Sequence, residues 1–309
     1  MGTRPGKFIA TSSVRKWIEA VKNNGRSGFE RLGHSFLFLA FFAFFAVISP
    51  AQNFDNLALA IQSGSSEQKR DALFQIRNLK TEHASRLAVP ALNDRDEIVR
   101  ATAASAVVYL PSSESAQLLT PLLADKQPFV RKEAAYALGV VRDKSATASL
   151  LRLLAKEKDL EVKSAIVIAV GEIGDTSAVE TLNKLFSERP KEETEFLRRS
   201  AARSIGQIAQ IVKTGETYIV TPQNFLPDNF KKGESRDITK DFPVFGAAII
   251  RLDGVLQNNN ESDDTRREAA FALGAIGSRA SINILQTYQN SPDPYLAEIS
   301  KEALLKIAK

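Results

Sequence analysis

Residues 130–141 read VRKEAAYALGVV, and this pattern recurs along the chain. Val130, Ala134 and Leu138 are spaced as one face of an α-helix, so each copy predicts an amphipathic helix. The steps between successive copies are 31, 32, 35 and 68 residues, and the last is twice 34. A period of this length is typical of a repeat protein whose units stack on one another. The other copies are VRATAASAVVYL at 99–110, VKSAIVIAVGEI at 162–173, LRRSAARSIGQI at 197–208 and TRREAAFALGAI at 265–276.

A second apolar segment follows each copy, so the repeating unit is a pair of helices joined by a short turn. We predict an all-α fold, an α-solenoid (superhelix) of about six pairs, because a single pair cannot bury both of its faces. The first pair spans about residues 65–93, a helix over 295–308 caps the C-terminus, and residues 54–61 cover the N-terminal end. The motifs Ser177-x-x-Glu180 and Thr265-x-x-Glu268 predict capping boxes at two helix starts.

Glycine occupies the same slot near the end of the first helix in four copies. Glycine inside a helix costs about 1 kcal/mol relative to alanine, so its recurrence at one phase needs a cause. We expect that a neighbouring helix approaches so closely there that a Cβ would block it. The four residues are Gly139, Gly171, Gly206 and Gly274.

The pattern V-R-x-x-A-A-x-A-L-G-x-I resembles the HEAT-like repeats of the phycobilin lyase type. The resemblance covers about residues 65–309 apart from one insertion. It implies that the arginine of the Val-Arg pair belongs to a ladder between helices, while Lys163 departs from that pattern. A row of ligand-binding arginines is the alternative. The arginines in question are Arg100, Arg131, Arg198 and Arg266.

Residues 1–51 have the form of a leader. A basic stretch ends at Arg31, and the apolar core FLFLAFFAFFAVI at 36–48 precedes Ser49-Pro50-Ala51, a small–x–small triplet. A spanning helix needs about 20 apolar residues, so the shorter core favours a signal peptide cleaved between Ala51 and Gln52. The mature repeat domain would then be residues 52–309, exported to the periplasm or cell envelope. The alternative is an uncleaved anchor in the inner membrane.

The helical periodicity stops at about residues 211–241. Long loops without regular structure are usually functional or disordered. This insertion holds the aromatic residues Tyr218, Phe225 and Phe230, followed by Lys231 and Lys232. Two interpretations stay open: the aromatic side chains bind a partner, with the lysines at the rim, or they pin the loop against the repeats.

Composition excludes several kinds of chemistry. The net charge of +5 comes from the leader, which holds seven of the 41 Lys and Arg and two of the 36 Asp and Glu, leaving 34 of each. The repeat domain is therefore neutral overall, and we do not expect a nucleic-acid partner. The chain has no Cys, and its two His are His34 and His83. We therefore expect no metal site, no cofactor and no catalytic triad.

These patterns predict a non-enzymatic protein-binding scaffold or adaptor of the cell envelope. It would present helical surfaces and one inserted loop to a protein partner, and it would touch a membrane only through an uncleaved leader. Two alternatives remain. The resemblance implies an enzyme subunit related to bilin lyases, and an uncleaved leader would make the chain a membrane-tethered adaptor.

Overall fold

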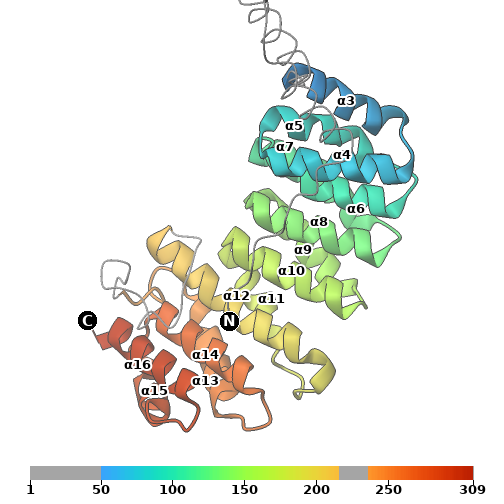
Figure 1. The fold of residues 1–309 in the computed structure, drawn as a ribbon. Helices are drawn as coiled ribbons and strands as arrows, with labels where there is room; N and C mark the ends of the chain where they lie inside the picture. The colour runs from blue at the N-terminus through green and yellow to red at the C-terminus, as the bar shows by residue number, and fades with distance from the viewer. Residues whose placement is uncertain (1–49, 216–235, 309) are drawn as a thin grey trace, which may run out of the picture. The chain divides into compact units, whose positions relative to one another are not determined.

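The computed structural model describes residues 50–215 and 236–308. Helix α3 (Pro50–Ser63) comes first, six helix pairs follow in chain order, and α16 (Pro294–Ala308) comes last (Figure 1). Residues from Asn53 onward form one compact unit. All regular elements of the described ranges are helical, and the predicted all-α solenoid of about six pairs with a C-terminal capping helix is confirmed.

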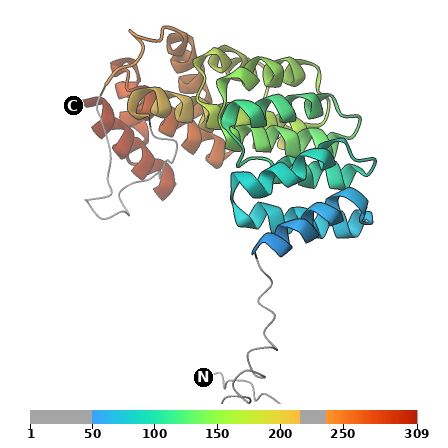
Figure 2. The same cartoon turned by 90° about the horizontal axis from the view of Figure 1, so that it is seen from above.

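The helices of the six pairs form two rows. Successive first helices contact each other from α4 to α14, and α16 continues this row (Figure 2). Helix α5 packs against α4, whereas every later second helix contacts the next helix of the row, as α7 contacts α8 and α15 contacts α16. The first helices are α4 (Ser66–Leu79), α6 (Glu97–Ala106), α8 (Pro128–Val141), α10 (Leu160–Ile173), α12 (Glu195–Thr214) and α14 (Asp263–Ile276). The second helices are α5 (Glu82–Ala88), α7 (Ser112–Leu119), α9 (Thr147–Lys156), α11 (Val179–Lys184), α13 (Val244–Gln257) and α15 (Ile282–Tyr288).

The glycine slot is where neighbouring first helices come closest. A Cβ on Gly139 would lie 2.9 Å from the Cα of Ala169 in α10, and a Cβ on Gly206 would lie 2.8 Å from the Cα of Ala272 in α14. A Cβ on Gly274 would lie 2.7 Å from the Cα of Ala303 in α16. These contacts are with backbone atoms, which cannot move aside, so the predicted cause of the glycine repeat is confirmed.

Both predicted capping boxes are wrong. Ser177 lies inside a short 3-10 turn, and Asp175 caps that turn by accepting from the Ser177 N–H at 3.0 Å. Thr265 is buried within α14, whose N-cap is Ser262. The capping box that the structure does show is formed by Ser65 and Gln68 at the start of α4. Sequence motifs of this kind recur by chance inside helices, and only the backbone course identifies the first turn.

The ends of the predicted insertion belong to the fold. Helix α12 continues through Thr214, and on the return side Ile238 is buried and its N–H donates to the Ile276 carbonyl at 3.2 Å. The two ends meet at Gly277, where a Cβ would overlap the Arg236 carbonyl oxygen and lie 3.0 Å from Lys213 Nζ. A shortened chain must therefore keep residues up to 215 and from 236 onward.

We expect Gly171→Leu to destabilise the protein. A Cβ at Gly171 would lie 2.7 Å from the Cβ and 3.0 Å from the Cα of Ser204 in α12, so a larger side chain must push two first helices apart. Overpacking typically costs about 1–3 kcal/mol. Thermal unfolding followed by circular dichroism measures the effect. Lys184→Ala, at an exposed side chain of α11, is the control, and equal midpoints for the two variants would contradict the packing described here.

Candidate functional site: the exposed face of the first helices

Arg100, in α6, joins two turns of the chain. Its Nε donates to the Asp125 carboxylate at 2.8 Å, and its Nη1 donates to the carbonyl of Asp94 at 2.8 Å. Asp94 ends the preceding pair, and Asp125 ends the pair to which Arg100 belongs. The arginine therefore clamps one pair to the next, in a site where its side chain is only 10% exposed.

Two further arginines repeat this geometry. Arg131 donates to Glu157 at 2.7 Å and to the Asp125 carbonyl at 2.9 Å. Arg198 pairs with Glu261 in a site where both side chains are almost fully buried, and it donates to two carbonyls of the preceding pair. Lys69, in the degenerate first pair, holds the equivalent place through a 2.6 Å contact with Asp94. The sequence pattern missed Lys69 because its repeat lacks the Val-Arg motif.

Two positions of the motif depart from this geometry. Arg266 donates to the Leu256 carbonyl at 3.1 Å, and its guanidinium lies 5.3 Å from the centre of the Tyr288 ring. Its carboxylate partner is Asp263 of its own helix, at 3.5 Å, and not a residue that ends the pair. The side chain of Lys163 makes no hydrogen bond or ion pair with the described residues, in keeping with its departure from the arginine pattern. The guanidinium groups of Arg100, Arg131 and Arg198 all bind carboxylates and carbonyls of the chain itself.

The pKa values follow from these contacts. Burial by itself would raise the pKa of Asp125, but hydrogen bonds from Arg100 and from the Gln127 N–H hold that pKa below its ordinary value. The pKa of Glu157 is lowered in the same way by its hydrogen bond from Arg131. Both carboxylates are therefore ionised at neutral pH and act as fixed charges.

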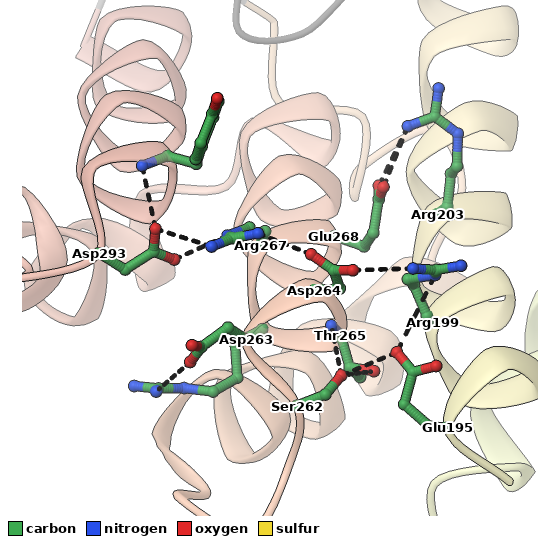
Figure 3. Close-up of polar contacts among 12 residues, drawn as sticks. Glu195, Arg199, Arg203, Ser262, Asp263, Asp264, Thr265, Arg267, Glu268 and Asp293 are labelled. Atoms are coloured by element: carbon green, nitrogen blue, oxygen red, sulfur yellow. Dashed lines mark hydrogen bonds and ion pairs between the residues drawn. The ribbon is translucent and has the colours of Figure 1, made fainter. Parts of the chain in front are cut away.

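A second line of charges runs across the exposed face of α12, α14 and α16. Arg199 donates to Asp264 at 2.8 Å, Asp264 also accepts from Arg267 at 2.6 Å, and Arg267 continues to Asp293 at 2.7 Å (Figure 3). Arg203 lies 3.2 Å from Glu268, whose pKa is raised by burial. The sequence holds a signal for this line: the residue after the motif arginine is basic at 132, 199 and 267, and its acidic partner lies within two residues of the start of the next helix in the row.

Large apolar side chains recur at one exposed slot of the same face. Ile98, Phe129, Phe196 and Tyr295 each immediately precede the first buried residue of a first helix, and they are 43 to 55% exposed. The rings of the last three have a cation 5.1 to 5.4 Å from their centres, supplied by Lys132, Arg199 and Arg267. We call Phe129, Phe196 and Tyr295 the aromatic row.

A hollow of about 320 Å³ lies on this face, where side chains of α8, α10 and α12 line it. Tyr136 of α8 and Phe196 of α12 stand on either side of it, and α10 presents the small Ser164 between them. Aromatic side chains in such depressions are typical anchors of protein interfaces. The aromatic row and this hollow are the part of the described surface best suited to a partner.

The other predicted site residues are not brought into this surface. Tyr218, Phe225, Phe230, Lys231 and Lys232 lie outside the described residues. The predicted cleavage position, Ala51 and Gln52, lies in the first turn of α3. Within residues 50–215 and 236–308 no group of three or more His, Asp or Glu is arranged to hold a metal ion. In the same ranges no helix has both the length and the apolar character of a membrane span.

Two family models match the chain. Residues 85–171 match HEAT repeats, and residues 265–291 match the PBS lyase HEAT-like repeat. No curated protein matches the sequence.

Solved structures share the fold. An engineered protein aligns with 85% of this chain and 70% of its own at 20% identity, with a TM-score of 0.52. The complex of CpcE and CpcF of phycocyanin lyase from Nostoc sp. PCC7120 aligns at 23% identity over 82% of this chain and 87% of that chain, with a TM-score of 0.44. A designed armadillo repeat protein aligns at 17% identity over 82% of this chain and 98% of its own, with a TM-score of 0.40.

The fold defines the class of protein: this chain is an α-solenoid of stacked helix pairs. More narrowly, residues 85–171 match HEAT repeats, and the sixth pair matches the PBS lyase HEAT-like repeat.

We expect Asp125→Asn to destabilise the protein in a pH-dependent way. The folded chain lowers the pKa of Asp125 below its ordinary value of 3.8, so the ion pair stabilises the fold above that pH and its contribution is lost as the pH falls through the folded value. At pH 7 the loss is about 1–3 kcal/mol, because Arg100 keeps a buried charge without its carboxylate.

Urea unfolding at a series of pH values from 7 to 3 measures this effect. The difference in unfolding free energy between wild type and Asp125→Asn should shrink at the acidic end. Glu180→Gln, at an exposed carboxylate of α11, is the control. A difference that stays constant with pH would show that the charge of Asp125 does not carry the effect.

Proposed function

We propose that this chain is a non-enzymatic scaffold that binds a protein partner across the exposed face of its first helices. The aromatic row carries this proposal. Solvent-exposed Phe and Tyr side chains return at one slot of alternate helices of this row, in α8, α12 and α16, while the same slot holds Glu161 in α10 and Asp264 in α14. Monomeric proteins rarely leave large apolar side chains exposed in register, so such a surface marks an interaction site.

The charges of this face favour a protein over a nucleic acid. Lys132, Arg199 and Arg267 are each paired with a carboxylate of the next first helix or turn. A surface that follows phosphates needs basic side chains in excess of acidic ones, and here the two alternate. A neutral face with aromatic side chains instead suits the mixed apolar and polar surface of a protein.

The insertion is the second part of the proposed interface. Its Tyr218, Phe225 and Phe230 would act as anchors, with Lys231 and Lys232 at the rim affecting association rate more than affinity. The described residues on either side of the insertion, Lys213 and Arg236, meet beside Gly277.

We further propose that the protein is exported and acts in the periplasm or cell envelope. The thirteen-residue apolar core at 36–48 and the Ser49-Pro50-Ala51 triplet support this location. An envelope scaffold also fits a chain without cysteine, because an oxidising compartment penalises stray thiols.

We expect the double variant Phe129→Ala, Phe196→Ala to lose most of its protein partner. The tagged full chain is recovered from its native host, and co-purifying proteins are identified by mass spectrometry. A second variant, in which residues 216–235 become a short Gly/Ser linker, tests the insertion. Leu59→Ala, which removes an even more exposed apolar side chain from α3, is the matched control.

All three proteins should unfold at nearly the wild-type temperature, because the altered side chains are exposed or leave the core ends of the insertion in place. Partner recovery equal to wild type in both test variants would contradict the proposed surface. Co-purification of a bilin pigment in place of a protein would instead favour the lyase-related alternative.

We expect the protein recovered from its native host to begin at Gln52. Signal peptidase requires small residues at the first and third positions before the cleaved bond, which Ala51 and Ser49 supply. Intact-mass measurement of the protein from the soluble envelope fraction checks this. A mass that includes residues 1–51 would place the chain in the membrane-anchored class, while replacing Ala51 by Arg should block cleavage in the exported form.

A further inference from the structure

A groove of about 540 Å³ opens on the row of second helices, between the fourth and fifth pairs. Its walls come from α11, from the irregular segment 185–190 that follows α11, and from α13. Asn183 ties the two walls together by donating to the Ala247 carbonyl at 3.3 Å. The aromatic row stands on first helices, so this groove is a separate surface.

The floor of the groove is neutral and rigid. Arg198 and Glu261 line it, with side chains only 4% and 2% exposed, and they satisfy each other. Arg198 also donates to the carbonyls of Leu185 and Glu188, which holds the irregular segment in place. No charge of the floor is therefore available to a ligand.

The rim has a different character. Arg189 and Arg251 both line the groove and are exposed, and neither side chain makes a hydrogen bond or an ion pair with any described residue. This sets them apart from the arginines of the ladder and of the first-helix face, which are all paired. Glu188 is the one unpaired carboxylate of the described rim, so the two arginines outnumber it and the groove attracts negative charge.

Helix α13 also lines the groove with Ile250 and Gly254, which carry no polar side chain. Ile250 is 77% exposed, the most exposed large apolar side chain in the described part of the chain. One turn further along the helix, Gly254 has no atom within 4 Å of the position that a Cβ would take. A glycine in an exposed helix interior weakens the helix without any packing benefit inside this chain. It does let another backbone come close to α13 beside Ile250.

We infer that this groove binds an acidic peptide segment of a partner protein. Carboxylates of the segment pair with Arg189 and Arg251, and an apolar side chain between them packs on Ile250 over Gly254. Arginine suits this role because its planar guanidinium binds a carboxylate through two parallel hydrogen bonds. The inference rests on the proposed function in that the partner is a protein, but it uses a different face and different residues.

Random twelve-residue peptides displayed on phage are the probe. The full chain is the bait, and the double variant Arg189→Glu, Arg251→Glu is used for counter-selection. We expect the selected peptides to be enriched in Asp and Glu with at least one large apolar residue between them. A synthetic peptide of the most enriched sequence is then labelled, and its affinity is measured by fluorescence anisotropy.

Each single charge reversal should weaken the binding of that peptide by about tenfold or more, since it replaces a charge-assisted hydrogen bond with repulsion. Ile250→Ala should weaken binding less, and raising the salt concentration should weaken it for wild type. Arg152→Glu is the matched control: it reverses an exposed arginine of the second helix α9, outside the groove, and should leave the affinity unchanged. Thermal unfolding confirms that all variants are folded.

Three results would overturn the inference. One is that no acidic sequence is enriched, another is that the enriched peptides bind the charge-reversed chain equally well, and the third is that Arg152→Glu weakens binding as much as Arg251→Glu. Binding of random-sequence duplex DNA or of anionic vesicles that depends on Arg251, without any selected peptide, would assign the groove to another class of ligand and also count against it.

The two proposals fail separately. If the native partner is recovered by the charge-reversed chain and lost by Phe129→Ala, Phe196→Ala, the groove inference is wrong and the proposed function stands. If an acidic peptide binds the groove but no protein is recovered from the host, the proposed function is wrong.

Discussion

The close contact between successive first helices is the constraint on which the rest of this structure depends. At Gly139, Gly206 and Gly274 the neighbouring backbone lies where a side chain would begin, so the helices of this row meet almost backbone to backbone. Such contact brings the turns at the helix ends within reach of one another. The side chain of the motif arginine can then reach both the carbonyls at the end of one pair and the carboxylate at the end of the next. With wider spacing between the helices it could not reach both.

This arrangement also decides which residues remain for binding. The apolar stripe of each first helix is buried in the core. The basic residues after the motif arginine form ion pairs with carboxylates of the next repeat. What remains exposed in register is the slot just before the first buried residue, where Phe129, Phe196 and Tyr295 stand. Because the repeats set the spacing of this slot, a partner would meet an evenly spaced set of aromatic anchors on a rigid support.

The sequence period is interrupted at the fifth pair, although α12 still packs against α10 and α14, and both proposed partner surfaces outside the aromatic row arise there. Helix α12 runs for 20 residues, and the described chain resumes at Arg236, beside Gly277. The preceding second helix, α11, has only six residues. A short α11 leaves the segment 185–190 to be held by Arg198, and the groove opens between that segment and α13. The motif arginine, which clamps one pair to the next elsewhere in the chain, is Arg198 in this pair and lines the floor of the groove.

The sequence by itself determined the helix pairs, their number, the glycine slot and the arginines of the motif, because all of these follow from a period that local composition repeats. It did not identify the partners of those arginines, since Asp125, Glu157 and Glu261 lie 25, 26 and 63 residues away. Nor did it reveal that Asp175 and Ser262 cap their helices, that Ile238 enters the core, or that Arg189 and Arg251 share a groove. Those features depend on where distant turns meet, and only the stacking of the helices in three dimensions decides that.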